Sequence, residues 1–469
     1  MRVGLISLGC PKNRVDSEVI LGMLGSCGFQ VGGADETCDA IIVNTCAFIE
    51  DAKVEAMQEI LEALEMKAAR PDMRVYAAGC LPQRYPLELG AELSDLDGIY
   101  GVDELEKLVH DVARDLASVI STPRKPKLVV DTALKPSWLY DHTHPRLLTT
   151  LPHYAYVKIS EGCDHRCAFC TIPSIKGPFR SREVSSVVSE VNTLAQMGVK
   201  EVNLVSQDTT AFGSDTGSSL HKLLTELDKL PGPPWIRLLY MHPEKLDDEL
   251  LGIIKSSNRI LNYIDMPLQH VSGNILERMR RTAPSRRYLD LVANIRDFFG
   301  ENNVCLRTTL IVGFPGETDD EFAQLADFVE DAQFDRLTVF KFSRELGTEA
   351  WDMPDQVEDY EIDHRYHTLM NIQADVSFGR NSSYIGAIMK VLAESIGDDQ
   401  IGDGPDTRST DTCISRQVNQ ACPQFVGRSF RDAPEVDGMV YIQGQAEIGE
   451  FVDVEITEAM DYDLVGKVL

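Results

Sequence analysis

Three cysteines lie close together in the segment Cys163-Asp-His-Arg-Cys167-Ala-Phe-Cys170, and we call them the central triad. Three thiolates at this spacing can bind a cubane iron–sulfur cluster from one loop and leave one iron without a protein ligand. An open iron of this kind can chelate the amino and carboxylate groups of S-adenosylmethionine. The alternative is a structural zinc site, but zinc prefers four ligands with paired C-x-x-C spacing, and no second pair lies nearby. The spacing therefore favours an iron–sulfur cluster.

A second set of three cysteines, Cys10, Cys46 and Cys80, is spread along the first part of the chain, and we call it the N-terminal triad. Each of these cysteines directly follows a short apolar run that predicts a β-strand. Because the carboxyl ends of parallel strands lie side by side along one edge of a sheet, the three thiols can converge on one point. The alternative is three buried structural cysteines, a common fate of this residue. The other cysteines have no such placement, and we treat them as incidental: Cys27, Cys38, Cys305, Cys413 and Cys422.

The elements that must position the N-terminal triad alternate between apolar runs and helical patterns. Strands are predicted at 3–8, 40–44 and 74–78, with helices at 16–24, 54–67 and 104–116. This alternation predicts an α/β domain over residues 1–118, built on a parallel sheet with helices on its faces. Prolines then interrupt the pattern, and residues 119–152 are predicted to form a linker.

The elements that must position the central triad form a strand–helix unit that is repeated six times over residues 153–380. The predicted strands are 154–160, 201–206, 235–240, 263–267, 304–312 and 336–342. Six units are too few for a complete eight-stranded barrel, so we expect an open, partial barrel of the TIM type. The central triad follows the first of these strands, at the carboxyl end where ligands bind in such folds.

The last segment, residues 381–469, has short β-like runs separated by glycines, which predict a small β-barrel. A polar stretch at about 398–423 is predicted to be a loop inserted into that barrel.

Six further residues in or near the central strands are candidate contacts to a bound cofactor. Phe169 could pack beside an adenine, and Gly313 would let the backbone approach a nucleoside closely. The other candidates are polar residues at or in strands: Gln207, Asp208, Gln269 and Arg307. The alternative for each is a polar side chain that only satisfies neighbouring backbone groups.

The charge of the chain restricts its partners. It carries 74 acidic and 45 basic residues, a formal net charge of −29, and such a protein repels phosphate backbones unless a local basic patch intervenes. A basic protein is therefore a better first expectation for the partner than a nucleic acid.

No signal peptide and no apolar run of membrane-spanning length is visible, so we expect a cytoplasmic protein.

The C-terminal segment is especially acidic, with sixteen Asp or Glu against six Lys or Arg in residues 381–469. Asp432, Glu435 and Asp437 place three carboxylates within six residues. We expect this run to be an exposed docking surface for a basic protein, since opposite charges raise the encounter rate and fix orientation.

Several motifs taken together resemble the methylthiotransferase branch of the radical S-adenosylmethionine enzymes over nearly the whole chain. They are, in order, Ser7-Leu8-Gly9-Cys10-Pro11-Lys12-Asn13 with Asp16-Ser17-Glu18, Asn44-Thr45-Cys46, Gly79-Cys80, Glu161-Gly162-Cys163 through Cys170, Pro267-Leu268-Gln269-His270, and Val312-Gly313-Phe314-Pro315-Gly316-Glu317-Thr318. Two local matches, at 9–13 and 431–438, favour the type that modifies an aspartate of small-subunit ribosomal protein S twelve over the tRNA-modifying MiaB type. The C-terminal segment resembles the TRAM domain of this family.

The resemblance implies two 4Fe–4S clusters and S-adenosylmethionine as cofactors. The cluster on the central triad would generate a radical that removes hydrogen from the β-carbon of the aspartate, and the cluster on the N-terminal triad would hold the sulfur that becomes a methylthio group. A sulfur donor and an electron donor such as flavodoxin or ferredoxin are implied as partners. A non-catalytic iron–sulfur scaffold would explain the cysteines but not the partial barrel.

Overall fold

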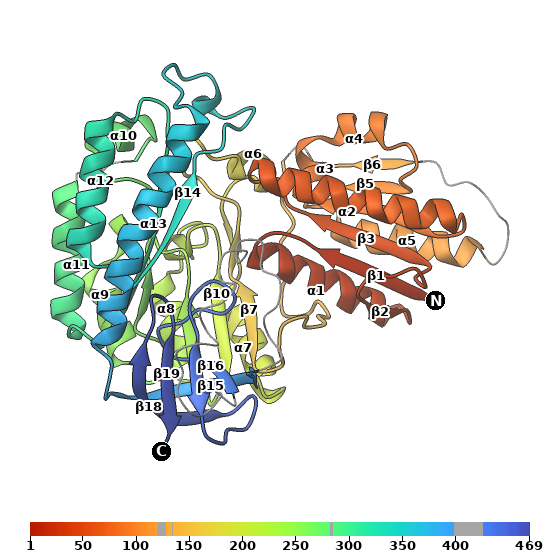
Figure 1. The fold of residues 1–469 in the computed structure, drawn as a ribbon. Coiled ribbons are helices and arrows are strands. Elements are labelled where there is room, and N and C mark those ends of the chain that lie inside the picture. Colours follow the sequence, from red (N-terminus) through yellow and green to blue (C-terminus); the bar gives the residue numbers. More distant parts are fainter. Residues whose placement is uncertain (120–127, 134, 282–284, 398–424) are drawn as a thin grey trace.

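The computed structural model describes residues 1–119, 128–133, 135–281, 285–397 and 425–469 (Figure 1). The chain forms an N-terminal α/β domain, a central α/β domain and a C-terminal β-barrel, as expected for the fold class. The predicted insertion at about 398–423 lies outside the described residues, as does part of the predicted linker.

The N-terminal domain is built on a six-stranded, wholly parallel sheet with the order β2-β1-β3-β4-β5-β6. Its strands are β1 (Arg2–Ser7), β2 (Gln30–Gly32), β3 (Ala40–Thr45), β4 (Arg74–Gly79), β5 (Gly98–Tyr100) and β6 (Val129–Asp131). Apolar side chains of α2 (Glu50–Ala69) pack on one face of the sheet, and those of α1 (Pro11–Ser26) and α5 (Leu105–Val119) pack on the other. Two short helices, α3 (Cys80–Arg84) and α4 (Pro86–Glu92), follow β4. The edge strand β6 belongs to the segment predicted as a linker, so that segment also completes the sheet.

The central domain contains all six predicted strands, arranged as two three-stranded parallel sheets with the orders β11-β10-β7 and β12-β13-β14. Their bounds are β7 (Tyr154–Lys158), β10 (Glu201–Val205), β11 (Trp235–Leu238), β12 (Tyr263–Asp265), β13 (Cys305–Val312) and β14 (Arg336–Lys341). A parallel bridge between Ile236 and Ile260 connects the two sheets, which together form the expected open, partial barrel.

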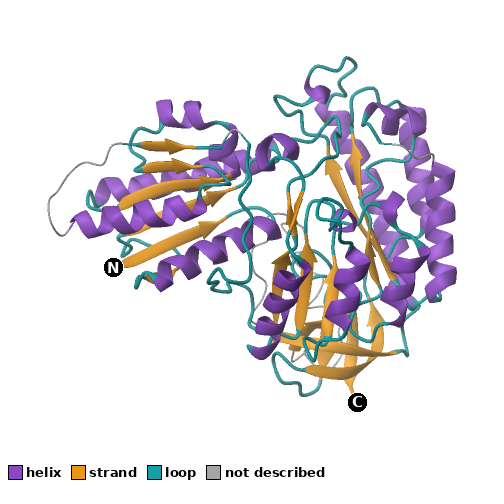
Figure 2. Ribbon diagram, turned by 180° about the vertical axis from the view of Figure 1, so that it is seen from behind, coloured by secondary structure: helices purple, strands orange, loops and turns teal. Residues whose placement is uncertain are grey.

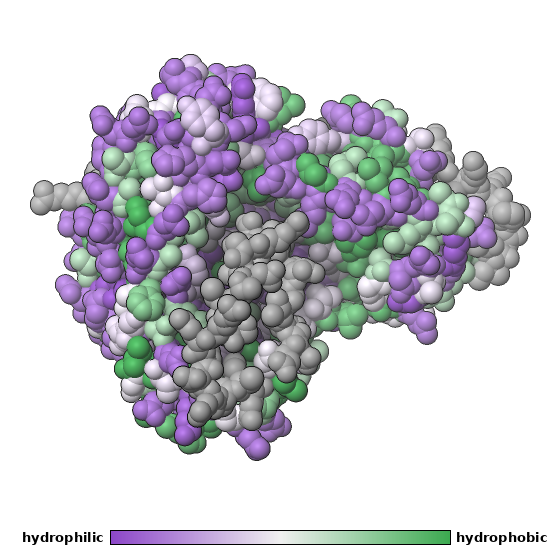
Figure 3. Space-filling model, in the orientation of Figure 1, coloured by the Kyte–Doolittle hydropathy of each residue, from purple (hydrophilic) through white to green (hydrophobic). Residues whose placement is uncertain are grey.

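Helices cover the outside of this partial barrel (Figure 2). They are α7 (Val184–Gln196), α8 (Leu220–Asp228), α9 (Asp248–Ser256), α11 (Ser285–Phe299), α12 (Asp319–Ala332) and α13 (Asp359–Ser382). Their inward faces and the strands share one large apolar core, while hydrophilic residues dominate the outer surface seen in Figure 3. Shorter elements lie in the loops: β8 (Ser160–Glu161), α6 (Ile172–Lys176), β9 (Arg180–Ser181) and α10 (Gly273–Arg278).

The C-terminal domain is a closed barrel with the strand order β15-β16-β17-β19-β18. The strands are β15 (Ile388–Ile396), β16 (Phe425–Arg428), β17 (Val440–Gln443), β18 (Phe451–Ala459) and β19 (Leu464–Val468). The barrel packs on the amino ends of the central strands: Arg428 lies 2.6 Å from Glu201 at the start of β10, and Arg336 at the start of β14 lies 2.6 Å from Asp432. The opposite, carboxyl ends of the central strands therefore stay available for a site.

The expectation of an exposed docking surface at 432–437 is wrong. Asp432 is buried against Arg336, and the buried carboxylate of Asp437 lies 3.2 Å from Arg307 of β13. Glu435 is exposed, but it accepts a hydrogen bond from Tyr154 (2.7 Å) and pairs with Arg14 of α1. These carboxylates hold the C-terminal barrel onto the other two domains, because each faces an arginine or a tyrosine across the interface.

Candidate functional site

The central triad lies on the loop between β8 and α6, at the carboxyl end of the first strand unit. Cys163 is buried, and Cys167 and Cys170 are partly exposed. The loop is fixed by two backbone hydrogen bonds of its residue Ala168, which donates to Met279 (3.1 Å) and accepts from Ala350 (2.9 Å). Since those partners lie at the far side of the partial barrel, the loop is anchored across the mouth of the barrel.

The N-terminal triad gathers at the carboxyl edge of the N-terminal sheet, as the strand-end pattern predicted. Cys10 precedes α1, Cys46 follows β3, and Cys80 is the first residue of α3. Gly9 has φ +83°, and a Cβ atom there would lie 2.6 Å from the Cβ of Cys46, so a glycine is needed for the two loops to approach this closely.

Two buried asparagines brace these loops. Asn13 donates from Nδ2 to the carbonyl of Leu8 (2.7 Å), and Asn44 donates from Nδ2 to the carbonyl of Asn13 (3.1 Å) and to Ser17 Oγ (2.8 Å). The hydrogen bonds connect the strand ends with the first turns of α1, so Cys10 is held in a fixed position relative to Cys46.

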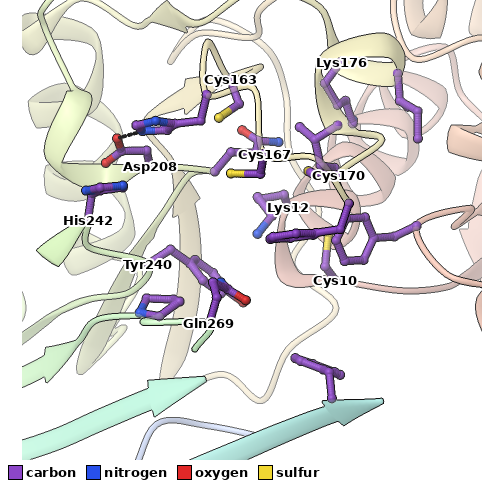
Figure 4. Close-up of a pocket in the computed structure, with 18 of the residues that line it drawn as sticks. Cys10, Lys12, Cys163, Cys167, Cys170, Lys176, Asp208, Tyr240, His242 and Gln269 are labelled. Carbon is purple, nitrogen blue, oxygen red and sulfur yellow. Dashed lines mark hydrogen bonds and ion pairs between the residues drawn. The ribbon is translucent and has the colours of Figure 1, made fainter. Parts of the chain in front are cut away.

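All six cysteines of the two triads line one cavity of about 340 Å³ between the N-terminal and central domains. In Figure 4 the side chains of the central triad and of Cys10 surround the same space, with Lys12 drawn between them. The sequence predicted two separate cysteine sites, and the structure brings them to one site.

The thiols fit clusters better than they fit a single metal ion. Within the described part of the chain, no three His, Cys, Asp or Glu side chains converge tightly enough for one ion. A cubane cluster takes its thiolates on separate irons, so three thiols spread over part of a cavity wall suit it, whereas zinc would need four converging ligands. Burial raises the pKa of Cys46 to about 11 and that of Cys170 to about 12, so a cluster that bound these thiols would have to displace their protons.

Four of the six candidate cofactor contacts line the cavity: Phe169, Gln207, Asp208 and Gln269. Gln207 donates from Nε2 to Glu161 (2.8 Å), which holds its amide at the cavity wall. Asp208 accepts hydrogen bonds from His165 (2.8 Å) and Lys245 (2.9 Å), and although burial opposes ionisation, these partners lower its pKa.

The other two candidates, Arg307 and Gly313, are not among the residues that line this cavity. Arg307 lies 3.1 Å from Asp265 and also pairs with Asp437, so its guanidinium joins strand β12 to the C-terminal barrel. Gly313 has φ +77° and packs closely against Ile362 of α13. Arg307 lies on a predicted strand and Gly313 directly follows the same strand, and in this structure both contact neighbouring elements.

Several cavity residues were not singled out by their sequence positions: Lys12, Lys176, Tyr240, His242 and Arg281. Tyr240 and His242 come just after β11. Ligands bind at the carboxyl ends of the strands in such folds, so the reasoning that selected Gln207 could have selected these two residues as well. His242 stacks on His165 with ring centroids 4.6 Å apart, and its burial, together with nearby Arg281, lowers its pKa to about 4. The pair therefore presents a neutral His242 beside the central triad.

A buried network of four charged residues joins the two domains beside the cavity. Lys158 pairs with Asp16 of α1 and with Glu161 (2.6 Å), and Lys176 lies 3.2 Å from Asp16 and 3.5 Å from Glu161. Burial alone would raise the pKa of Glu161, but the two ammonium groups outweigh it and lower that pKa. Only Asp16 comes from the N-terminal domain, so this carboxylate fixes α1 to the central domain.

Three known families match successive parts of the chain. Residues 2–101 match the uncharacterized protein family UPF0004, residues 157–329 match the Radical SAM superfamily, and residues 409–469 match the TRAM domain. The three matches follow the same order as the three domains of the fold.

Curated relatives match over the whole chain. A protein of Trichlorobacter lovleyi is 42% identical over 471 residues, which span 100% of this chain and 98% of the relative. A protein of Geobacter sulfurreducens is 40% identical over 471 residues, with the same coverage. Both carry the name ribosomal protein uS12 methylthiotransferase RimO.

Among solved structures, the radical S-adenosylmethionine methyltransferase TsrM of Kitasatospora setae has a similar fold. The TM-score is 0.55 at 15% identity, and the match covers 86% of this chain and 79% of TsrM.

Proposed function

The chain belongs to the RimO family of ribosomal protein uS12 methylthiotransferases, which are radical S-adenosylmethionine enzymes, and we propose that it places a methylthio group on the β-carbon of an aspartate of uS12. The observation that carries this proposal is the single cavity onto which both cysteine triads open. A reaction that removes a hydrogen and inserts sulfur at the same carbon needs both kinds of chemistry within reach of one substrate atom.

The match to the Radical SAM superfamily supports one 4Fe–4S cluster and S-adenosylmethionine as cofactors. We assign that cluster to the central triad, and we propose a second 4Fe–4S cluster on the N-terminal triad. When bound, these groups supply a radical that can take hydrogen from an unactivated carbon and a sulfur that can replace it. The chain's own residues must then hold both groups, orient the substrate carbon between them and keep water out.

The cavity wall supports these tasks. Phe169 presents an aromatic ring next to Cys170 and packs edge-on against Phe314, with ring centroids 6.4 Å apart, so it is fixed in place as a platform for an adenine. Gln207, Asp208 and Gln269 offer the polar groups that could orient the cofactor's ribose and amino acid parts. Apolar side chains from both domains, among them Phe48 and Ile175, complete the wall and exclude water.

A tRNA substrate of the MiaB type is less well supported, because the relatives that match over the full length carry the RimO name and the C-terminal segment is strongly acidic. A sulfur donor and an electron donor such as flavodoxin or ferredoxin complete the proposal, with the reaction in the cytoplasm. In the part of the chain that the structure describes, no helix is long and apolar enough to cross a membrane.

The proposal is tested by mass spectrometry of uS12 and of tRNA from cells with and without the gene. We expect uS12 to carry a methylthio group on one aspartate only when the gene is present. A gain confined to tRNA, or no gain on either, would contradict the proposed function.

A further inference from the structure

The charged residues around the cavity are mostly basic, although the chain as a whole carries a net charge of −29. Lys12, Lys176 and Arg281 line the cavity, and among the described residues that line it Asp208 is the one carboxylate. Asp208 is itself bound by His165 and Lys245. The cavity is therefore suited to an anionic group of a substrate.

Two of the three cations are already engaged. Lys176 is paired with Asp16 and Glu161 in the buried network. The guanidinium of Arg281 donates to the carbonyl of Pro267 (3.2 Å). Lys176 is therefore paired with carboxylates, whereas the carbonyl holds the guanidinium of Arg281 at the cavity wall without neutralising its charge.

Lys12 is different. Its ammonium lies 3.8 Å from the centre of the Tyr240 ring, and no carboxylate of the described residues forms an ion pair with it. A cation–π contact with a neutral ring positions an ammonium group but does not neutralise its charge. Lys12 therefore brings a positive charge that no carboxylate of the described residues pairs with into a cavity that both triads share (Figure 4).

The backbone of Tyr240 is held in a strained conformation. Its φ is +62°, a left-handed conformation that is unfavourable for a tyrosine, and its N–H donates to the buried Asp265 (2.8 Å). Strained backbone of this kind is kept only where the surroundings enforce it, and it concentrates at functional sites. Here the strain places the ring beneath the Lys12 ammonium.

We propose that the Lys12 ammonium binds the side-chain carboxylate of the target aspartate of uS12, which makes Lys12 a specificity-determining residue. This inference rests on the proposed function and names the group that the site recognises. The β-carbon is bonded directly to the carboxyl carbon, so a carboxylate held by Lys12 fixes the reacting carbon inside the cavity. The charge also discriminates against uncharged groups such as an asparagine side chain or an adenine.

Binding without turnover tests this inference. The probes are recombinant uS12 and the same protein with the target aspartate replaced by asparagine, titrated anaerobically against the cluster-loaded enzyme with S-adenosylmethionine and no reductant. The parent should bind the aspartate form about 10- to 100-fold more tightly, as expected for one charge-assisted contact. Lys12→Met should bind both forms with similar affinity, and Lys12→Arg should retain part of the preference.

Arg14→Gln is the matched control, because it removes a positive charge from the same helix at a residue that pairs with Glu435 away from the cavity. It should keep the parent's preference, and all variants should show the parent's iron content. The inference is overturned if Lys12→Met still prefers the aspartate form, or if the parent modifies uS12 but binds both forms equally. A parent that modifies no uS12 at all overturns the proposed function, and this inference with it.

Discussion

The ammonium of Lys176 lies 3.2 Å from the carboxylate of Asp16, so a residue six positions after Cys170 is ion-paired with a residue six positions after Cys10. The pair is buried and joins α6 of the central domain to α1 of the N-terminal domain. Because each partner is rigidly connected to a cysteine of a different triad, the pair helps to set the separation of the two triads.

Asp16→Asn should separate this positioning effect from cofactor cleavage. The change leaves Lys158 and Lys176 with one carboxylate, Glu161, between them, and an uncompensated buried charge costs about 3 kcal/mol or more of stability. We expect a lower free energy of unfolding, retained cleavage of S-adenosylmethionine and a loss of methylthio transfer. Asp35→Asn removes an exposed partner of Arg2 in the same domain and should change none of these. A variant that transfers the methylthio group at the parent's rate would show that Asp16 has no positioning role.

Cluster content tests the assignment of the two triads. Anaerobically reconstituted parent protein should hold two 4Fe–4S clusters per chain by iron and sulfide analysis. Replacing all three cysteines of either triad by alanine should leave one cluster. Cys27→Ala, a change at an exposed cysteine outside the cavity, should leave both. A parent with one cluster, or the loss of all iron from either triple variant, is the outcome that the assignment does not allow.

Single cysteine changes should divide the chemistry between the triads. Cys167→Ala removes a ligand of the proposed radical-forming cluster and should abolish reductive cleavage of S-adenosylmethionine. Cys46→Ala should leave this cleavage largely intact and block sulfur insertion, because the N-terminal triad lies on the other domain. Release of 5′-deoxyadenosine and modification of uS12 are measured in parallel. Equal loss of cleavage in both variants would argue against separate roles.

Acid should lower the stability of the protein through Glu394 of β15, which lies 2.6 Å from Arg428 of the same barrel and 3.0 Å from His153. Burial opposes ionisation, but Arg428 and His153 outweigh it and lower the pKa of Glu394 from 4.5 to about 2. This carboxylate therefore contributes up to about 3 kcal/mol above pH 4.5, and the contribution is lost as the pH falls from 4.5 through 2.

Glu394→Gln should be less stable than the parent at neutral pH, and the difference should shrink as the pH is lowered through this window. Urea unfolding can be followed by fluorescence of Trp235, whose ring lies 4.7 Å from Phe451 of the C-terminal barrel. Glu455→Gln removes an exposed carboxylate of the same barrel and should leave the unfolding free energy unchanged. A parent–variant difference that stays constant down to pH 2 would refute the linkage.

Much of the site could be predicted because its signals are local. The spacing of the central triad is a property of one loop, and the placement of Cys10, Cys46 and Cys80 follows from strand ends in a parallel sheet. The sequence could not reveal that both triads face one cavity, because the packing of the two domains depends on partners such as Asp16 and Lys158 that are distant in the chain.

Charge was the least reliable signal. From the sequence alone, the acidic run at 432–437 resembles a solvated surface. In the structure, Arg336 pairs with Asp432 and Arg307 pairs with Asp437 inside an interface between domains. Arg307 was a candidate cofactor contact because of its strand, but the strand pattern does not tell whether a side chain faces a ligand or a partner carboxylate. The edge strand β6 was missed because three residues of strand give too weak a pattern within a proline-rich segment.

In the proposed reaction, both triads act on one substrate carbon within one cavity. This reaction is tested most directly with uS12 that carries deuterium on the β-carbon of its aspartates, incubated with reduced, cluster-loaded enzyme and S-adenosylmethionine. We predict deuterium in the released 5′-deoxyadenosine and a methylthio group on an aspartate that has lost one deuterium, both dependent on uS12. Release of 5′-deoxyadenosine without deuterium while uS12 gains the methylthio group, or no modification of uS12 at all, would show that the triads do not share one substrate carbon.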